Sequence, residues 1–181
     1  MAPHSNQLSR DWPIEHFHRL AILCVERLDA VVEFVGTRPQ RHSVNRIIRE
    51  LPVDRYINRC GLLNWKDTEE RIRLAACVVS NNSGVGHLAA RLGIPTISIF
   101  GATHSPLEWM PRGNNVAVIV RGTACSPCLL DSNSLNACPH KLRCLTDIDP
   151  FQVFRELCRV IDQSAGPVEE IAAQDNSLSA N

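Results

Sequence analysis

Two polar, glycine-containing stretches follow apolar runs in the middle of the chain. The run CVVS is followed by Asn81, Asn82, Ser83 and Gly84, and the run PTISIF is followed by Gly101, Ala102 and Thr103. Such stretches suit an anion, because glycine lets the backbone come close and the N–H groups at a helix start are unpaired. We expect a phosphate-bearing ligand here, with Ser83, Gly84 and Thr103 as donors. The alternative is that the glycines only make tight turns and that Ser83 caps a helix.

A second group with chemical potential is a cluster of cysteines near the C-terminus. Cys125, Cys128, Cys138 and Cys144 are separated by two, nine and five residues, and His140 lies among them. Four thiolates that converge at about 2.3 Å satisfy tetrahedral zinc. A structural zinc site is therefore one hypothesis. The alternative is free thiols or occasional disulfides.

These residues must be positioned by helices and strands, and the hydrophobic pattern predicts an alternation of the two. Alternating amphipathic segments and short apolar runs are typical of an α/β fold with a parallel sheet covered by helices on both faces. We expect the third helix to be capped by Asp67 or Thr68, and a weak strand around Tyr56 and Ile57. This third helix is expected over 66–77 and the other helices over 12–28, 41–51, 84–93 and 149–162, and the other expected strands are 30–36, 77–80, 95–100 and 116–120.

Length and composition predict one domain over residues 1–162, followed by a frayed polar tail over 163–181. Lys plus Arg and Asp plus Glu each number 19, so no net charge attracts nucleic acid. No apolar run reaches the roughly 18 residues that a membrane-spanning helix needs. The first residues do not resemble an export signal, so we expect a cytoplasmic protein with reduced thiols.

Three segments carry a resemblance to a known family. SNNSGVGHLAARLGIPTISIFGATHSPLEWMP resembles the signature of glycosyltransferase family 9, the bacterial heptosyltransferases that build the lipopolysaccharide core. APHSNQLSRDWPIEHFHRLA is similar to the segment that opens the C-terminal half of these enzymes, and CSPCLLDSNSLNACPHKLRCLTDIDPFQV is similar to the run that closes many of them. Together these segments cover about Ala2 to Leu157.

The resemblance implies the C-terminal, donor-binding half of a GT-B glycosyltransferase, which is built from two Rossmann-like halves. It implies an ADP-heptose-like donor, transfer with inversion to a lipopolysaccharide-core acceptor, and no required metal or other cofactor. The general base of the family belongs to the N-terminal half, so we expect no catalytic residue in this chain. The isolated chain should then be inactive and need a separate N-terminal half as a partner.

The resemblance also implies which residues bind the donor: Arg10, Asn82, Ser83, Gly84, His87, Gly101 and Thr103. Arg10 stands where the family has a lysine, and a guanidinium binds phosphate at least as well. Asn82 stands where the family usually has an aspartate, so the charge is lost. This change supports the alternative of a non-catalytic module that binds a nucleotide sugar or keeps only the fold. A third hypothesis makes the cysteine cluster a zinc-dependent interaction site.

The remaining residues near these motifs are expected to have structural roles. Trp12 and Trp109 lie near prolines, and we expect both mainly to pack against the protein, with a place in the lining of the donor site as the alternative for either. His104 and Glu108 lie in the loop after the second glycine turn, and we expect them to be exposed to solvent.

Overall fold

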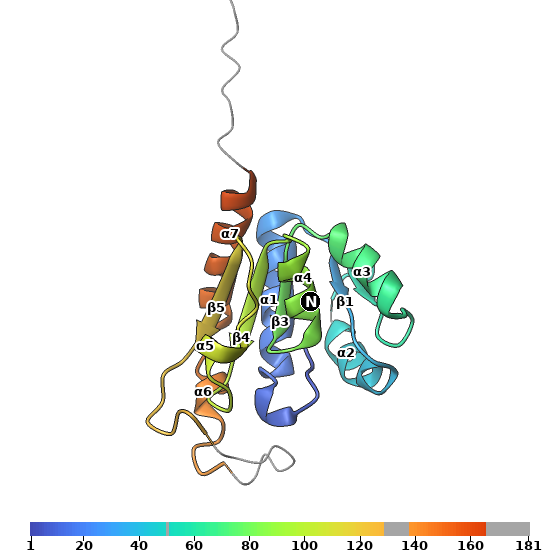
Figure 1. Ribbon diagram of the computed structural model, residues 1–181. Helices are drawn as coiled ribbons and strands as arrows, with labels where there is room; N and C mark the ends of the chain where they lie inside the picture. The colour runs from blue at the N-terminus through green and yellow to red at the C-terminus, as the bar shows by residue number, and fades with distance from the viewer. Residues whose placement is uncertain (50, 129–137, 166–181) are drawn as a thin grey trace, which may run out of the picture.

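The computed structural model describes residues 1–49, 51–128 and 138–165, and it contains two groups of parallel strands (Figure 1). The first is the pair β1 and β2, and the second is β3, β4 and β5 in that order. The strands are β1 (Val32–Phe34), β2 (Tyr56–Asn58), β3 (Val78–Asn81), β4 (Thr96–Phe100) and β5 (Val116–Val120). The predicted α/β class and the weak strand at Tyr56 are confirmed.

Helices cover both faces of these strands. The helices are α1 (Ile14–Leu28), α2 (Arg41–Ile48), α3 (Trp65–Arg73), α4 (Gly84–Arg91), α5 (Pro106–Trp109), α6 (Arg143–Thr146) and α7 (Pro150–Ala165). α1 and α7 contact each other on one face, and α7 also contacts β4 and β5. α4 contacts β3, β4 and α3, and in Figure 1 it lies on the opposite face of the strands from α1. This two-sided cover is the Rossmann-like arrangement that the sequence predicts.

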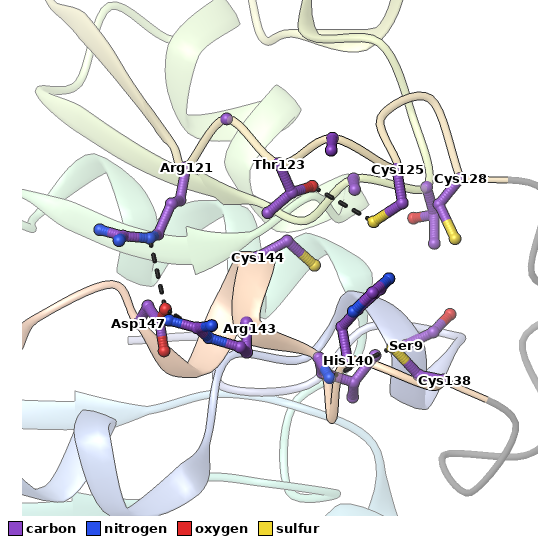
Figure 2. A pocket seen from close by; sticks show the side chains of 15 residues that line it. Ser9, Arg121, Thr123, Cys125, Cys128, Cys138, His140, Arg143, Cys144 and Asp147 are labelled. Carbon is purple, nitrogen blue, oxygen red and sulfur yellow. Dashed lines mark hydrogen bonds and ion pairs between the residues drawn. The ribbon is translucent and has the colours of Figure 1, made fainter.

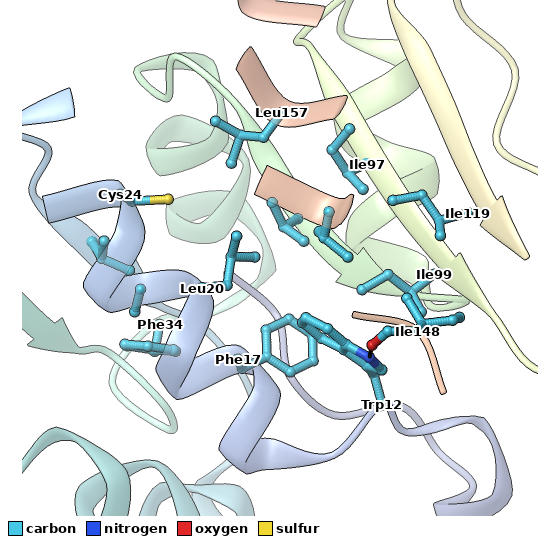
Figure 3. Close-up of a cluster of buried hydrophobic side chains, with 14 of the residues drawn as sticks. Trp12, Phe17, Leu20, Cys24, Phe34, Ile97, Ile99, Ile119, Ile148 and Leu157 are labelled. Carbon is cyan, nitrogen blue, oxygen red and sulfur yellow. Dashed lines mark hydrogen bonds between the residues drawn. The ribbon is translucent and has the colours of Figure 1, made fainter. Parts of the chain in front are cut away.

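Trp12 belongs to the larger core, in which it packs beside Phe17 (Figure 3). Its indole is 1% exposed and meets Phe17 edge to face at 5.0 Å between ring centroids. Its Nε1 donates to the carbonyl of Ile148 at 3.0 Å, so the polar end of the ring is satisfied inside the core. The predicted packing role of Trp12 is confirmed, and the ring joins the segment before α1 to the segment before α7.

Several predicted boundaries need correction. The third helix is capped by Asn64, whose side chain accepts from the backbone N–H of Asp67 at 2.9 Å, and not by Asp67 or Thr68. Trp65 therefore opens the helix, because the cap lies three residues ahead of the N–H that it satisfies. α7 continues to Ala165, beyond the predicted domain boundary at residue 162. The rest of the predicted tail, 166–181, lies outside the described residues.

Two further observations concern the chain as a whole. All eight cysteines belong to the described residues, and all are free thiols. Within the described ranges, the structure contains no helix with the length and apolar character needed to span a membrane.

Candidate functional site

A cleft of about 570 Å³ opens beyond the carboxyl ends of β1 and β3. Its walls come from the segment before α1, the turn after β1, the start of α3 and the start of α4. In open parallel sheets, ligands bind at this edge. Five of the predicted donor-binding residues lie together in its wall: Arg10, Asn82, Ser83, Gly84 and His87.

Three of these residues hold buried polar atoms without a hydrogen-bond partner in the described part of the chain. They are Nε of Arg10, Nδ2 of Asn82 and Oγ of Ser83. Leaving such atoms unpaired costs about 1 to 3 kcal/mol each. Because the three residues line one cleft, a single polar ligand is able to satisfy them together.

The start of α4 adds unpaired backbone donors to this cleft. Ser83 is the N-terminal flanking residue of α4, and its side chain makes no capping bond. The idea that the Ser83 hydroxyl serves only as a cap is therefore wrong. α4 lies close against β3 because Gly86 has no side chain, and a Cβ there would collide with the Ser80 hydroxyl. The first N–H groups of a helix have no partner within the helix and favour an anion.

The segment that carries Arg10 is fixed to β3 by Asn81. Oδ1 of Asn81 accepts from the backbone N–H of Trp12 at 3.0 Å, and Nδ2 donates to the carbonyl of Pro3 at 2.7 Å. Asn81 is fully buried. From the sequence, Asn81 is recognisable only as part of the polar stretch, because nothing in the spacing shows that its side chain bonds to residues about seventy positions earlier.

A second set of hydrogen bonds holds the segment before α1, which carries Arg10, against α2. Nδ1 of His4 contacts Oδ2 of Asp11 at 3.0 Å, and Nε2 of His4 contacts Oγ of Ser43 at 2.6 Å. The other oxygen of Asp11 accepts from the backbone N–H of Ser5 at 2.7 Å. Sequence reasoning missed these residues as well. The two sets of bonds make the loop a rigid support for Arg10.

Two tryptophans also line the cleft. Trp65 at the start of α3 and Trp109 at the end of α5 are 58% and 54% exposed. Trp109 is too exposed for the expected role in packing; its ring borders the cleft, which fits the alternative, and meets His104 edge to face at 5.6 Å. Trp65 was not singled out from the sequence. Large aromatic rings exposed in a cleft suit a flat ligand group.

His104 lies beside the cleft rather than in open solvent. Its side chain is partly buried, and its Nδ1 is 3.2 Å from the hydroxyl of Thr103. Burial and, second, the charge of Arg10 lower the pKa of His104. The pKa of His104 therefore depends on the charges close to Arg10. Glu108 is exposed, as expected.

The structure does not bring Gly101 and Thr103 into this cleft. Gly101 is buried, and a Cβ there would lie 3.2 Å from the side chain of Leu145 and 3.4 Å from the carbonyl of Ser9. Gly101 thus permits close packing at the end of β4. Thr103 lines a neighbouring cavity of about 290 Å³. A donor-binding role for these two residues stays a prediction.

The neighbouring cavity is the one that the cysteines surround (Figure 2). Cys125 and Cys128 come from the loop after β5, and Cys138, His140 and Cys144 come from the opposite wall. Sγ of Cys138 accepts from the backbone N–H of Leu142 at 3.3 Å, and Sγ of Cys125 lies 3.4 Å from Oγ1 of Thr123. Burial raises the pKa of Cys144. This thiol is therefore held in its protonated form.

The residues of this cavity do not form a metal-binding set in the described part of the chain. There, no three His, Cys, Asp or Glu side chains are close enough together to hold an ion. Residues 129–137, which connect Cys128 to Cys138, lie outside the described residues. A zinc site at the four cysteines stays a prediction, and metal analysis of the purified protein tests it.

Comparison with known proteins identifies the family. Residues 1–138, more than half of the chain, match the family described as glycosyltransferase family 9 (heptosyltransferase). The chain belongs to glycosyltransferase family 9. It is 23% identical over 159 residues to lipooligosaccharide heptosyltransferase 2 of Campylobacter jejuni, an alignment that covers 86% of this chain and 48% of that protein. The chain thus spans about half the length of a curated family 9 relative.

Solved structures give the same fold. ADP-heptose lipopolysaccharide heptosyltransferase II of E. coli superimposes with a TM-score of 0.75 at 22% identity, over 91% of this chain and 46% of that one. The E. coli heptosyltransferase WaaC with ADP superimposes with a TM-score of 0.65 at 16% identity, over 88% and 43%. Family 9 enzymes are GT-B glycosyltransferases, and this chain has the fold of about half of one. The predicted fold class and family are confirmed.

Proposed function

We propose that this chain is the donor-binding half of a heptosyltransferase-type glycosyltransferase. The observation that carries the proposal is that buried polar atoms of Arg10, Asn82 and Ser83, which have no hydrogen-bond partner in the described chain, line one cleft. The ligand is a nucleoside diphosphate sugar of the ADP-heptose type. It would pass its sugar to a lipopolysaccharide-core acceptor, as in the heptosyltransferases to which this chain is similar.

Each residue in the cleft has a chemical task in this proposal. The Arg10 guanidinium donates charge-assisted hydrogen bonds to the diphosphate, each worth about 1.5 to 3 kcal/mol. The Ser83 hydroxyl and the first amides of α4 donate to the same phosphates. As the sugar leaves, charge builds up on the diphosphate, and these donors stabilise it without a metal ion. His87 and the Asn82 amide face the sugar side.

The exposed rings of Trp65 and Trp109 give the nucleotide a flat apolar surface. A nucleobase that lies against an indole buries apolar area on both rings. Because this chain supplies only one wall of the proposed binding site, the side of the ligand that faces away from it stays in water. We therefore expect affinity for ADP in the micromolar to millimolar range, about 4 to 8 kcal/mol of binding free energy.

The second candidate is a module that binds the nucleotide sugar without transferring it. Asn82 favours it, because an amide has no charge and fewer acceptor sites than a carboxylate. Exchanging Asn82 for Asp should change the preference for ADP-sugar over ADP more than the affinity for ADP. A separate N-terminal half as partner and a cytoplasmic location also stay predictions.

Two assays on the purified chain test the proposal. Calorimetry should detect ADP binding and much weaker binding of AMP, because the second phosphate supplies the contacts to Arg10 and α4. The chain alone should transfer no sugar from ADP-heptose, because the expected general base lies in the other half. Equal affinities for AMP and ADP would contradict the proposal that the cleft binds a diphosphate. Sugar transfer by the chain alone would contradict the proposal that it is only the donor-binding half of the enzyme.

A further inference from the structure

Positive charge is concentrated in α2 and in the turn before it. Between Glu33 and Glu50 the sequence has no aspartate or glutamate, but it has four arginines: Arg38, Arg41, Arg46 and Arg49. The whole chain carries equal numbers of basic and acidic residues, 19 of each. This segment is therefore a local excess of positive charge within a neutral chain. In Figure 1, α2 lies at the lower right, on the outside of the molecule.

The exposed basic side chains of this segment share one face of the helix. They are separated by four, four and three positions: Arg38, His42, Arg46 and Arg49. At about 100° per residue, the last three lie within about 60° of one another around the helix axis. Val44 and Ile47 are buried on the opposite side. Arg41 is held against β2, where its Nη1 donates to the carbonyl of Asn58 at 3.2 Å, so the exposed four alone form what we call the basic face.

The charge of the basic face is poorly neutralised by the described part of the chain. Arg46 pairs with Glu15 at 3.7 Å, but the two side chains are 63% and 69% exposed. An ion pair this open to solvent holds its partners weakly. Arg38 and Arg49 form no ion pair with any described residue, and Glu50 lies outside the described residues. The face therefore presents positive charge to solvent.

The charge pattern favours one class of anionic partner over another. Single-stranded nucleic acid is bound by basic grooves in which aromatic rings stack on the bases, and residues 35–55 contain no Phe, Tyr or Trp. The neutral chain also lacks the overall positive field that attracts nucleic acid. A helix with arginines along one exposed face is typical of proteins that bind the anionic headgroups of a lipid bilayer.

We propose that the basic face of α2 binds the anionic headgroups of a membrane surface. Arg38 belongs both to this face and to the lining of the cleft, so the face leads to the edge of the cleft. The acceptor of the proposed function is lipid-linked and would lie in the same surface, and in that respect the inference rests on the proposed function. Binding is weak and reversible, because each arginine near an anionic surface contributes little.

Sedimentation with lipid vesicles tests the inference on the full chain. The vesicles contain either phosphatidylcholine alone or equal parts of phosphatidylcholine and phosphatidylglycerol. We expect the chain to bind only the vesicles with phosphatidylglycerol. Raising the salt concentration from about 50 to about 500 mM should release most of the bound protein, because salt screens exposed charges. Equal binding to both kinds of vesicle, or binding that salt does not weaken, would overturn the inference.

A matched pair of double variants locates the surface that binds. Arg46→Gln with Arg49→Gln removes two charges of the basic face. Arg73→Gln with Arg159→Gln removes two charges from α3 and α7, where each arginine pairs with a glutamate. Both variants reach the same net charge. We expect the first to lower the vesicle partition coefficient about tenfold or more and the second to change it less than about twofold, whereas equal losses would show that only net charge matters and would overturn the inference.

Two further measurements separate this inference from its alternatives. Arg46 and Arg49 do not line the cleft, so we expect the first double variant to bind ADP as the parent chain does while it loses vesicle binding. Salt-sensitive vesicle binding by a parent chain that binds no ADP would support the membrane surface and contradict only the proposed function. Tighter binding of the parent chain to a DNA or RNA oligonucleotide than to the vesicles would overturn the choice of partner.

Discussion

The cleft beyond β1 and β3 and the neighbouring cysteine cavity both lie at the carboxyl edge of the sheet, but their charged side chains are arranged differently. In the cavity, Arg121 and Arg143 both pair with Asp147, at 3.5 and 3.0 Å (Figure 2). In the cleft, Nε of Arg10 is buried without a partner in the described chain. An arginine whose charge is already matched offers little to an anion, whereas an unmatched one gains the full charge-assisted bond. The comparison therefore favours the cleft over the cavity as the place for the proposed diphosphate.

The two regions also differ in the structural elements that hold their side chains in place. The cleft residues follow directly from β3, and Asn81 ties them to the loop of Arg10. The cysteines lie on loops after β5 and around α6, and their thiols bond within those loops. Binding groups on rigid elements hold their geometry better than groups on loops. This contrast can be tested by substitutions that act on one region or on both.

The largest effect is expected from Trp12→Ala, because Trp12 supports both regions. Its backbone bonds to Asn81 behind the cleft, and its ring bonds to Ile148 close to α6. Loss of a buried tryptophan costs about 3 to 5 kcal/mol of unfolding free energy. Urea denaturation measures it, with Trp12→Phe as the control that keeps an aromatic ring in the core but loses the Nε1 bond to Ile148 and part of the packing. A loss below about 1 kcal/mol for Trp12→Ala would contradict this central role.

A smaller effect is expected from Ser83→Ala, and almost none from Thr103→Val. The Ser83 hydroxyl lies in the cleft, so its removal should weaken ADP binding about two- to tenfold. Thr103 lines the cysteine cavity, so its substitution should change ADP affinity by less than about twofold. Calorimetric titration of both variants checks the comparison. The assignment fails if Thr103→Val weakens binding more than Ser83→Ala does.

The smallest effect concerns pH. Burial and the charge of Arg10 lower the pKa of His104 in the free protein. A diphosphate bound to Arg10 should raise this pKa, so binding takes up a proton and ADP affinity increases as the pH falls through the titration of His104. NMR titration of the His104 ring with and without ADP measures the shift. A pKa that stays constant or falls on ADP binding would place the phosphates elsewhere.

The sequence predicts the elements well because their hydrophobic period and glycine boundaries are local signals. It also predicts four of the five cleft residues correctly as neighbours, because the motif from Asn82 to His87 follows directly from one strand into one helix, whereas Arg10 comes from the resemblance of a separate segment. It cannot predict that Thr103 lies in another cavity, because the direction of the chain after β4 depends on the packing of Gly101 against Leu145. Trp65 and the His4–Asp11 contact were missed for the same reason: their roles arise from tertiary contacts between distant segments.

The central claim, that Arg10 is the anion-binding cation of this half, is tested most directly by titrating ADP into matched arginine variants. Arg10→Ala removes a cation of the cleft whose buried Nε has no partner in the described chain, and Arg121→Ala removes a paired cation from the same edge of the sheet. We predict that Arg10→Ala weakens ADP binding by about 1.5 to 3 kcal/mol, tenfold or more, while Arg121→Ala changes it by less than about twofold. Circular dichroism establishes that both variants are folded. Equal losses in the two folded variants, or no ADP binding by the parent chain at millimolar ligand, would contradict the account.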